Sequence, residues 1–189
     1  MKLSHILAAG LVSIAAFSAS VARAADEYLT LQLKDGPVVI KLMPDVAPNS
    51  VKRLEDLAKK GEYDGVVFHR VIDGFMAQTG DVKFGNSTKG YQPKMAGMGG
   101  SSLPDLKAEF SKVPFERGTV GMARSQNPDS ANSQFFIMFA PGSFLNGQYT
   151  VVGKVVSGME AVDKIKRGEG SNGEVSNPDK IIKATVGKP

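Results

Sequence analysis

The most informative stretch of this 189-residue chain is Phe68-His69-Arg70-Val71-Ile72-Asp73-Gly74-Phe75-Met76-Ala77-Gln78-Thr79-Gly80-Asp81. It is complemented further along by Asn132-Ser133-Gln134-Phe135-Phe136-Ile137. Together the two stretches place one arginine and two glutamine amides among large apolar side chains. This combination predicts an apolar pocket with a few fixed hydrogen-bond donors, without a nucleophile, a set of metal ligands or a phosphate cradle.

The surrounding sequence predicts mostly β structure. Short runs rich in β-branched and aromatic residues, separated by turn residues, predict strands over 28–33, 38–42, 66–72, 75–78, 119–123, 135–139, 151–156 and 181–186. Helical spacing begins near Pro48 and ends at Gly61, and a weaker helical pattern covers 159–166. Residues 83–104 have no sustained period and predict a long ordered loop, which is usually functional. The pattern alone indicates an all-β barrel or sandwich with two helices.

The N-terminus predicts a cleaved signal peptide over residues 1–24. Lys2 is followed by an uncharged apolar run over 6–19, and Ala22-Arg23-Ala24 offers small residues at the cleavage site. The run is shorter than the roughly 20 residues that a membrane-spanning helix needs. Residues 25–189 are then a single exported domain, and the absence of cysteine fits a soluble protein of a bacterial periplasm or secreted space.

The charge of the chain argues against a nucleic-acid partner. The formal charge is +4, and removal of Lys2 and Arg23 leaves 4 − 2 = +2 because residues 1–24 contain no acid. Nucleic-acid binding calls for a concentrated basic stripe, which is not present. We also expect no stable membrane insertion, and a monomer.

Hydrolytic and metal chemistry are disfavoured by the histidine count. His69 is the only histidine after the signal peptide, whereas a zinc site needs several nitrogen or sulfur ligands. A serine hydrolase is the least favoured alternative, because no Gly-x-Ser-x-Gly elbow is present. Neighbouring residues of a strand point to opposite faces, so if Arg70 faces a site, His69 is expected to face away and make a structural hydrogen bond.

Both quoted stretches resemble the two signature segments of the cyclophilins, the peptidyl-prolyl cis-trans isomerases. The matching order continues through Phe144-Leu145-Asn146-Gly147-Gln148-Tyr149-Thr150-Val151-Val152-Gly153-Lys154-Val155. The resemblance covers nearly all of the chain after the first two dozen residues. It implies a closed antiparallel eight-stranded barrel capped by helices at its two ends, and a peptidyl-prolyl isomerase (EC 5.2.1.8) that needs no cofactor and no metal.

The resemblance also implies the roles of individual residues. Arg70 and Gln78 are the expected catalytic residues. The expected substrate-binding residues are Phe75, Met76, Ala123, Arg124, Gln134, Phe136, Phe144, Leu145 and Tyr149. On residue types alone the phenylalanines would more often belong to a core, and strand alternation leaves Phe68 and Phe135 as core residues.

Three positions depart from the best-known eukaryotic cyclophilins. They carry tryptophan where this chain has Phe144, histidine where it has Tyr149, and asparagine where it has Arg124. The combination resembles the bacterial exported branch, whose substrates would be proline-containing, unfolded or partly folded exported polypeptides. Because Phe144 lacks the indole N–H donor, weak cyclosporin binding is expected. The alternative from another class is a chaperone module that binds proline peptides without required turnover.

Overall fold

The computed structural model describes residues 27–188, so the signal-peptide prediction for residues 1–24 lies outside the described part of the chain. The described strands are β1 (Tyr28–Leu33), β2 (Gly36–Leu42), β3 (Arg70–Ile72), β4 (Met76–Thr79), β5 (Thr119–Met122), β6 (Phe135–Met138), β7 (Val151–Ser157) and β8 (Lys183–Val186). The helices are α1 (Pro48–Lys59), α2 (Met159–Asp163) and a short 3₁₀ helix, η1 (Ser143–Leu145). Every strand and both helices lie where the sequence predicts them, with bounds shifted by a few residues.

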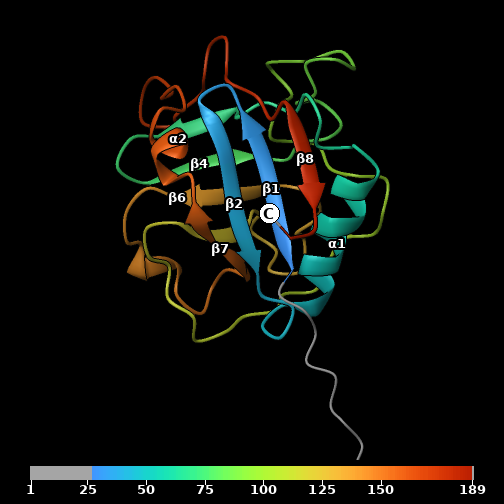
Figure 1. Ribbon diagram of the computed structural model, residues 1–189, viewed down its shortest axis with the longest axis vertical. Coiled ribbons are helices and arrows are strands. Elements are labelled where there is room, and N and C mark those ends of the chain that lie inside the picture. Colours follow the sequence, from blue (N-terminus) through green and yellow to red (C-terminus); the bar gives the residue numbers. More distant parts are fainter. Residues whose placement is uncertain (1–26, 189) are drawn as a thin grey trace, which may run out of the picture.

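All eight strands form one antiparallel sheet in the order β3-β4-β6-β5-β7-β2-β1-β8. The sheet curls, and β4 and β6 cross behind β1 and β2 in Figure 1. The edge strands β3 and β8 are not paired with each other. Hydrogen bonds from the chain before β3 instead reach the chain before β8, such as Phe68 N–H to the Asp179 carbonyl at 2.8 Å and Ile181 N–H to the Val66 carbonyl at 2.9 Å. The architecture is therefore a curled, barrel-like sheet, and its closure by strand pairing stays a prediction.

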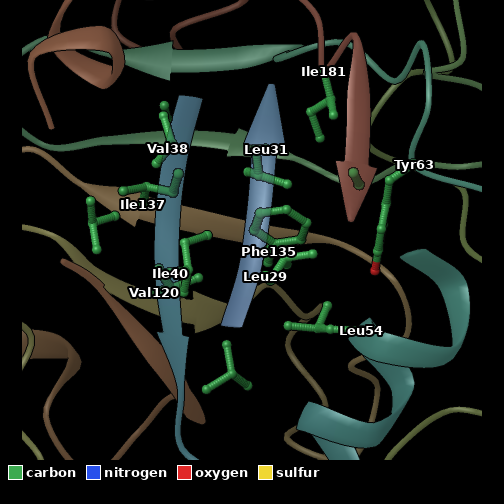
Figure 2. Close-up of a cluster of buried hydrophobic side chains, with 14 of the residues drawn as sticks. Leu29, Leu31, Val38, Ile40, Leu54, Tyr63, Val120, Phe135, Ile137 and Ile181 are labelled. Carbon is green, nitrogen blue, oxygen red and sulfur yellow. The ribbon is translucent and has the colours of Figure 1, made fainter. Parts of the chain in front are cut away.

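The interior of the curled sheet is a continuous apolar core. Figure 2 shows side chains from β1, β2, β5 and β6 meeting there, with Leu54 of α1 beside them. Phe68 and Phe135 are fully buried, as strand alternation predicts. Tyr63 packs edge-on to Phe135 with ring centroids 5.5 Å apart, and its hydroxyl donates to the Ser133 carbonyl at 2.8 Å. Burial of the phenol is therefore compensated by a hydrogen bond.

The two helices lie on different parts of the sheet, with α1 against β8 and α2 against β2. Helix α1 starts at Pro48, whose missing N–H costs nothing at a helix start. Its next two N–H groups, at Asn49 and Ser50, donate to the Glu109 carboxylate at 3.0 and 2.8 Å. A distant loop thus supplies the N-terminal cap. Within residues 27–188, neither helix is long and apolar enough to cross a membrane.

Alternation along the strands divides their side chains between two clusters. Val71, Ala77, Phe135 and Ile137 point into the main core. The residues between them point to the opposite face, where Met76, Phe115, Phe136, Met138, Leu145 and Val151 form a second cluster. The outer face of β3, β4 and β6 therefore carries its own apolar floor, and the candidate site is built on it.

Candidate active site

A cavity of about 320 Å³ lies on this second cluster. Its walls are Arg70, Phe75, Met76, Gln78, Ala123, Arg124, Phe136, Phe144, Leu145 and Tyr149. These are all the predicted site residues except Gln134, which lines an adjoining cavity of about 370 Å³. The structure thus brings together residues that lie up to about 80 positions apart in the sequence.

Strand register explains why the polar residues form a row. Arg70 is paired with Gln78 across β3 and β4, and Gln78 is paired with Phe136 across β4 and β6. Directly opposed residues of antiparallel strands point to the same face with side chains in contact. The guanidinium, the amide and the aromatic ring are therefore held side by side by three neighbouring strands.

A chain of hydrogen bonds fixes the Arg70 guanidinium. Its Nε donates to the Asn172 carbonyl at 3.0 Å, and its Nη1 donates to Gln78 Oε1 at 3.2 Å. Gln78 Nε2 in turn donates to Gln134 Oε1 at 2.9 Å. Burial lowers the pKa of Arg70, yet a guanidinium stays protonated at neutral pH. The result is a permanent cation with a fixed orientation at the wall of an apolar cavity.

The same chain continues into the 83–104 loop. Gln134 Nε2 donates to the carbonyls of Gly97 and Gly99 at 2.9 and 2.7 Å. The N–H groups of those two glycines donate to the fully buried carboxylate of Asp81, at 2.8 and 2.9 Å. Asp81 also accepts from the N–H groups of Lys83 and Phe84. The loop is ordered, as predicted, and it supports the polar side of the cavity.

Stacked aromatic rings form the apolar floor. Phe136 stacks on Phe115 with centroids 5.7 Å apart and meets Tyr149 edge-on at 5.9 Å. A side chain at Gly121 would come within 2.6 Å of the Phe115 ring and 2.7 Å of the Phe136 ring. Glycine in the middle of β5 therefore leaves the space that the two rings occupy.

The rim of the cavity holds an exposed aromatic pair. Phe144 is 66% exposed, and its ring lies 5.4 Å from that of Phe75. Large apolar side chains seldom stay this exposed in a continuous patch unless they contact a partner. The rim is thus suited to an apolar ligand that enters the cavity from outside.

The structure corrects the expectation for His69. It lines no part of the site cavity, although it borders a separate cavity with Arg70 and Gln78, and neither ring nitrogen meets the geometry of a hydrogen bond among the described residues. Gly97 covers the ring, since a side chain there would come within 3.1 Å of Nε2. Burial, reinforced by the Arg70 charge and opposed by that of Asp81, lowers the pKa of His69 to about 4. Burial under the loop outweighs the nearby Val67 backbone and Gln134 side chain, which favour the protonated ring, and so keeps the imidazole neutral.

Several residues of the site were missed by sequence analysis. They are Asp81, Gly121 and the remaining walls of the adjoining cavity, namely Gly97, Met98, Gly99, Ser125, Ser130 and Asn132. An aspartate that directly follows a strand and precedes a glycine-rich loop was the available sign for Asp81. Residues 27–188 contain no group of three or more histidine, cysteine, aspartate or glutamate side chains that could hold a metal ion.

Comparison with known proteins identifies the family. Residues 28–186 match the family model described as cyclophilin type peptidyl-prolyl cis-trans isomerase. The chain belongs to this family. It is 64% identical over 186 residues to a probable peptidyl-prolyl cis-trans isomerase of Brucella suis, covering 97% of this chain and 95% of that protein. It is 38% identical over 166 residues to peptidyl-prolyl cis-trans isomerase A of Dickeya dadantii, covering 85% and 82%.

Solved cyclophilin structures have the same fold. A cyclophilin from Hirschia baltica superposes with a TM-score of 0.71 at 26% identity, covering 85% of this chain and 73% of that one. A Cryptosporidium parvum cyclophilin, crystallised in the presence of the dipeptide Ala-Pro, also gives a TM-score of 0.71, at 24% identity and with 86% and 99% covered. The family model and the named relatives, rather than these structures, show that the activity is peptidyl-prolyl cis-trans isomerisation.

Proposed function

We propose that Arg70 accelerates isomerisation by stabilising the twisted state of the X–Pro bond. The planar peptide bond resists rotation by about 18–20 kcal/mol because its C–N bond is partly double. When the bond twists, conjugation is lost and the prolyl nitrogen regains a lone pair. A fixed cation that donates to this nitrogen binds the twisted state more strongly than either planar state, and only such differential binding speeds a step.

The observation that carries this proposal is the fixed guanidinium at an apolar wall. Nε and Nη1 of Arg70 are engaged by Asn172 and Gln78, whereas Nη2 has no acceptor within residues 27–188. That leaves a rigidly held donor for a ligand in the cavity. Gln78 is the positioning partner, because its amide is itself held by Gln134.

The apolar cavity has a separate part in the mechanism. Met76, Phe136 and Leu145 are almost completely buried and form a slot for the proline ring. Holding the ring lets the preceding residue rotate, and excluding water strengthens the Arg70 contact. No covalent bond breaks, so the reaction needs no nucleophile. An acceleration of about 10⁵-fold corresponds to lowering the activation free energy by about 7 kcal/mol. Electrostatic stabilisation and positioning of the substrate suffice for this amount.

An isomerisation assay on a proline-containing peptide tests the role of Arg70. In Arg70→Ala, kcat/KM is expected to fall at least about 100-fold, which corresponds to about 2.7 kcal/mol of transition-state stabilisation. Arg117→Ala is the matched control, because Arg117 is exposed, pairs with Asp163 and lines no part of the cavity. Circular dichroism checks that both variants are folded. Unchanged turnover in Arg70→Ala would remove Arg70 from the mechanism, and peptide binding without wild-type turnover would favour the chaperone module.

The cellular role of the enzyme is to assist folding of proline-containing exported polypeptides in the periplasm, as a monomer. Residues 1–24 support export, because they combine an early positive charge, an apolar run and a small-residue cleavage site. Mass spectrometry of the protein from a periplasmic extract tests this, with a mature N-terminus at residue 25 expected. An uncleaved protein in the cytoplasmic fraction would contradict export.

Cyclosporin binding is weak in this proposal. Phe144 packs against Phe75 at the rim, with the two rings tilted by 40°, but its side chain offers no N–H donor to a ligand. Calorimetry is expected to give an affinity far weaker than nanomolar, and a nanomolar dissociation constant would contradict this expectation.

A further inference from the structure

We propose that the Arg124 side chain forms a carboxylate subsite beside the cavity of about 320 Å³ that Arg70 lines, called the prolyl cavity from here on. The enzyme would then prefer aspartate or glutamate at the two positions before proline. This inference rests on the proposed function: with the proline ring in the first cavity, the inference places the preceding residues over the adjoining cavity, at Ala123 and Arg124, which line both. It adds to that function a substrate preference and a side chain that produces it.

The charged side chains that line the two adjoining cavities are all positive. Their combined walls contain two guanidinium groups, Arg70 and Arg124, and no aspartate or glutamate. Of the two guanidinium groups, Arg124 lines both cavities, whereas Arg70 lines the first of them alone. A cleft lined by charges of one sign attracts ligands of the opposite sign.

The Arg124 side chain is held in place by an aromatic ring and by backbone carbonyls. Its guanidinium lies 4.3 Å from the centroid of the Tyr149 ring. Nη1 donates to the Ser125 carbonyl at 2.8 Å, and Nη2 donates to the Gln148 carbonyl at 2.9 Å. A side chain ordered before the ligand arrives loses little further freedom on binding. The positive charge is therefore positioned in advance.

The Arg124 guanidinium has no acidic partner among the described residues. None of the ion pairs in this part of the chain involves Arg124, and its acceptors are all backbone carbonyls. A guanidinium has five N–H donors, and Nη2 carries two of them but makes a single hydrogen bond, to the Gln148 carbonyl, so one of its N–H groups stays open. Ser125 and Ser130 also line the adjoining cavity, but their hydroxyl hydrogens are engaged with each other and with the Asn127 carbonyl. The open N–H on Nη2 of Arg124 is therefore the donor that suits a carboxylate.

The size of the expected substrate preference follows from the solvent exposure of Arg124. Arg124 is partly exposed, so solvent and salt screen its attraction for a ligand carboxylate. We expect about a fivefold preference in kcat/KM for glutamate over lysine at low ionic strength, as for other partly exposed charge pairs.

The test compares peptides that differ only at one of the two positions before proline, where glutamate, glutamine or lysine is placed. The glutamate-to-lysine ratio of kcat/KM is measured within each enzyme, so a general loss of activity cancels. In wild type the ratio is expected to be about five and to shrink in 0.5 M salt. In Arg124→Gln it should approach one, whereas Arg124→Lys should keep most of it. Lys52→Gln removes one remote positive charge from the exposed face of α1 and should leave the ratio unchanged.

Equal rates for the three peptides at both positions in wild type would overturn the subsite. A preference that persists in Arg124→Gln would overturn it as well, because the charge would then act from Arg70 or from the protein as a whole. Failure of the proposed function would look different. In that case the neutral glutamine peptide would be turned over equally by wild type and Arg70→Ala.

Discussion

Two neighbouring residues of β6 contrast the two regions of the molecule. Phe135 points into the core, is completely buried and contacts Tyr63 edge-on. Phe136 points outward, is 5% exposed and has protein on one side of its ring and the prolyl cavity on the other. One short strand thus supplies both the packed interior and the binding surface. The contrast shows that the core packs without help from the site residues and holds rigid the strand that carries them.

The largest expected effect comes from removing the inner ring. Phe135→Ala should lower the free energy of unfolding by about 3–5 kcal/mol, because it leaves a cavity in a closed core. Urea denaturation measures this loss. The folded fraction should keep kcat/KM within about threefold, since the ring touches no part of the site. A loss of activity as large as that of site variants would show that core and site are not separable.

The second effect is a pH dependence through His69. Its pKa is about 4 in the folded protein and 6.5 in the unfolded chain, so the unfolded state binds the extra proton between these values. Stability should therefore be unaffected by this group above pH 6.5 and should fall as the pH drops towards 4. The expected loss is about 2.5 kcal/mol at pH 4.5 relative to neutral pH.

Urea denaturation of wild type and His69→Gln at several pH values isolates this contribution. The variant has no imidazole to protonate, so its stability should fall less steeply between pH 6.5 and 4.5. Parallel pH profiles would show that the imidazole stays accessible to protons in the folded state. The experiment also tests whether the ring, which lies beside Arg70 but under the loop, behaves as core.

A smaller stability effect is expected for the outer ring. Phe136→Ala should cost about 2 kcal/mol of unfolding free energy, less than Phe135→Ala, because water from the cavity fills the vacated space. Its kcat/KM should fall at least about tenfold, since the slot for proline loses its floor. Peptide titration and urea denaturation on the same samples give both values. A stability loss equal to that of Phe135→Ala would erase the contrast.

The smallest expected change is made by one methyl group. Gly121→Ala places a carbon within 2.7 Å of the Phe115 and Phe136 rings, which must shift. We expect a loss of about 1–2 kcal/mol in stability and a KM increase of about threefold, with kcat nearly unchanged. Gly153→Ala in β7 is the control, because a carbon there would come within 2.6 Å of the Lys41 carbonyl and 2.9 Å of Ile40 and should lower stability without changing KM. Equal KM values would show that the rings reposition freely.

The strands and the walls of the prolyl cavity could be predicted from the sequence, because both depend on local pattern and on motifs that resemble a family. Arg70, Gln78 and Phe136 could be placed on one face from alternation and motif alone. The role of Asp81 could not be predicted, since its carboxylate accepts N–H groups of Gly97 and Gly99, which no local pattern links to it. His69 was misjudged for a related reason. Alternation along a strand predicts the face to which a side chain points, but it does not predict whether a hydrogen-bond partner lies on that face.

The Asp81 carboxylate also divides the 83–104 loop into segments that it holds in place and an exposed segment between them. It binds the N–H groups of residues 83 and 84 on one side and of 97 and 99 on the other, so both ends of the loop meet at one buried group. Residues 88–95 between these ends are mostly exposed. Their length and sequence can therefore change while the backbone that supports Gln134 stays in place. The exposed middle of the loop is therefore suited to insertions, at which a cyclophilin of this type can acquire a new recognition segment without altering the walls of the cavity.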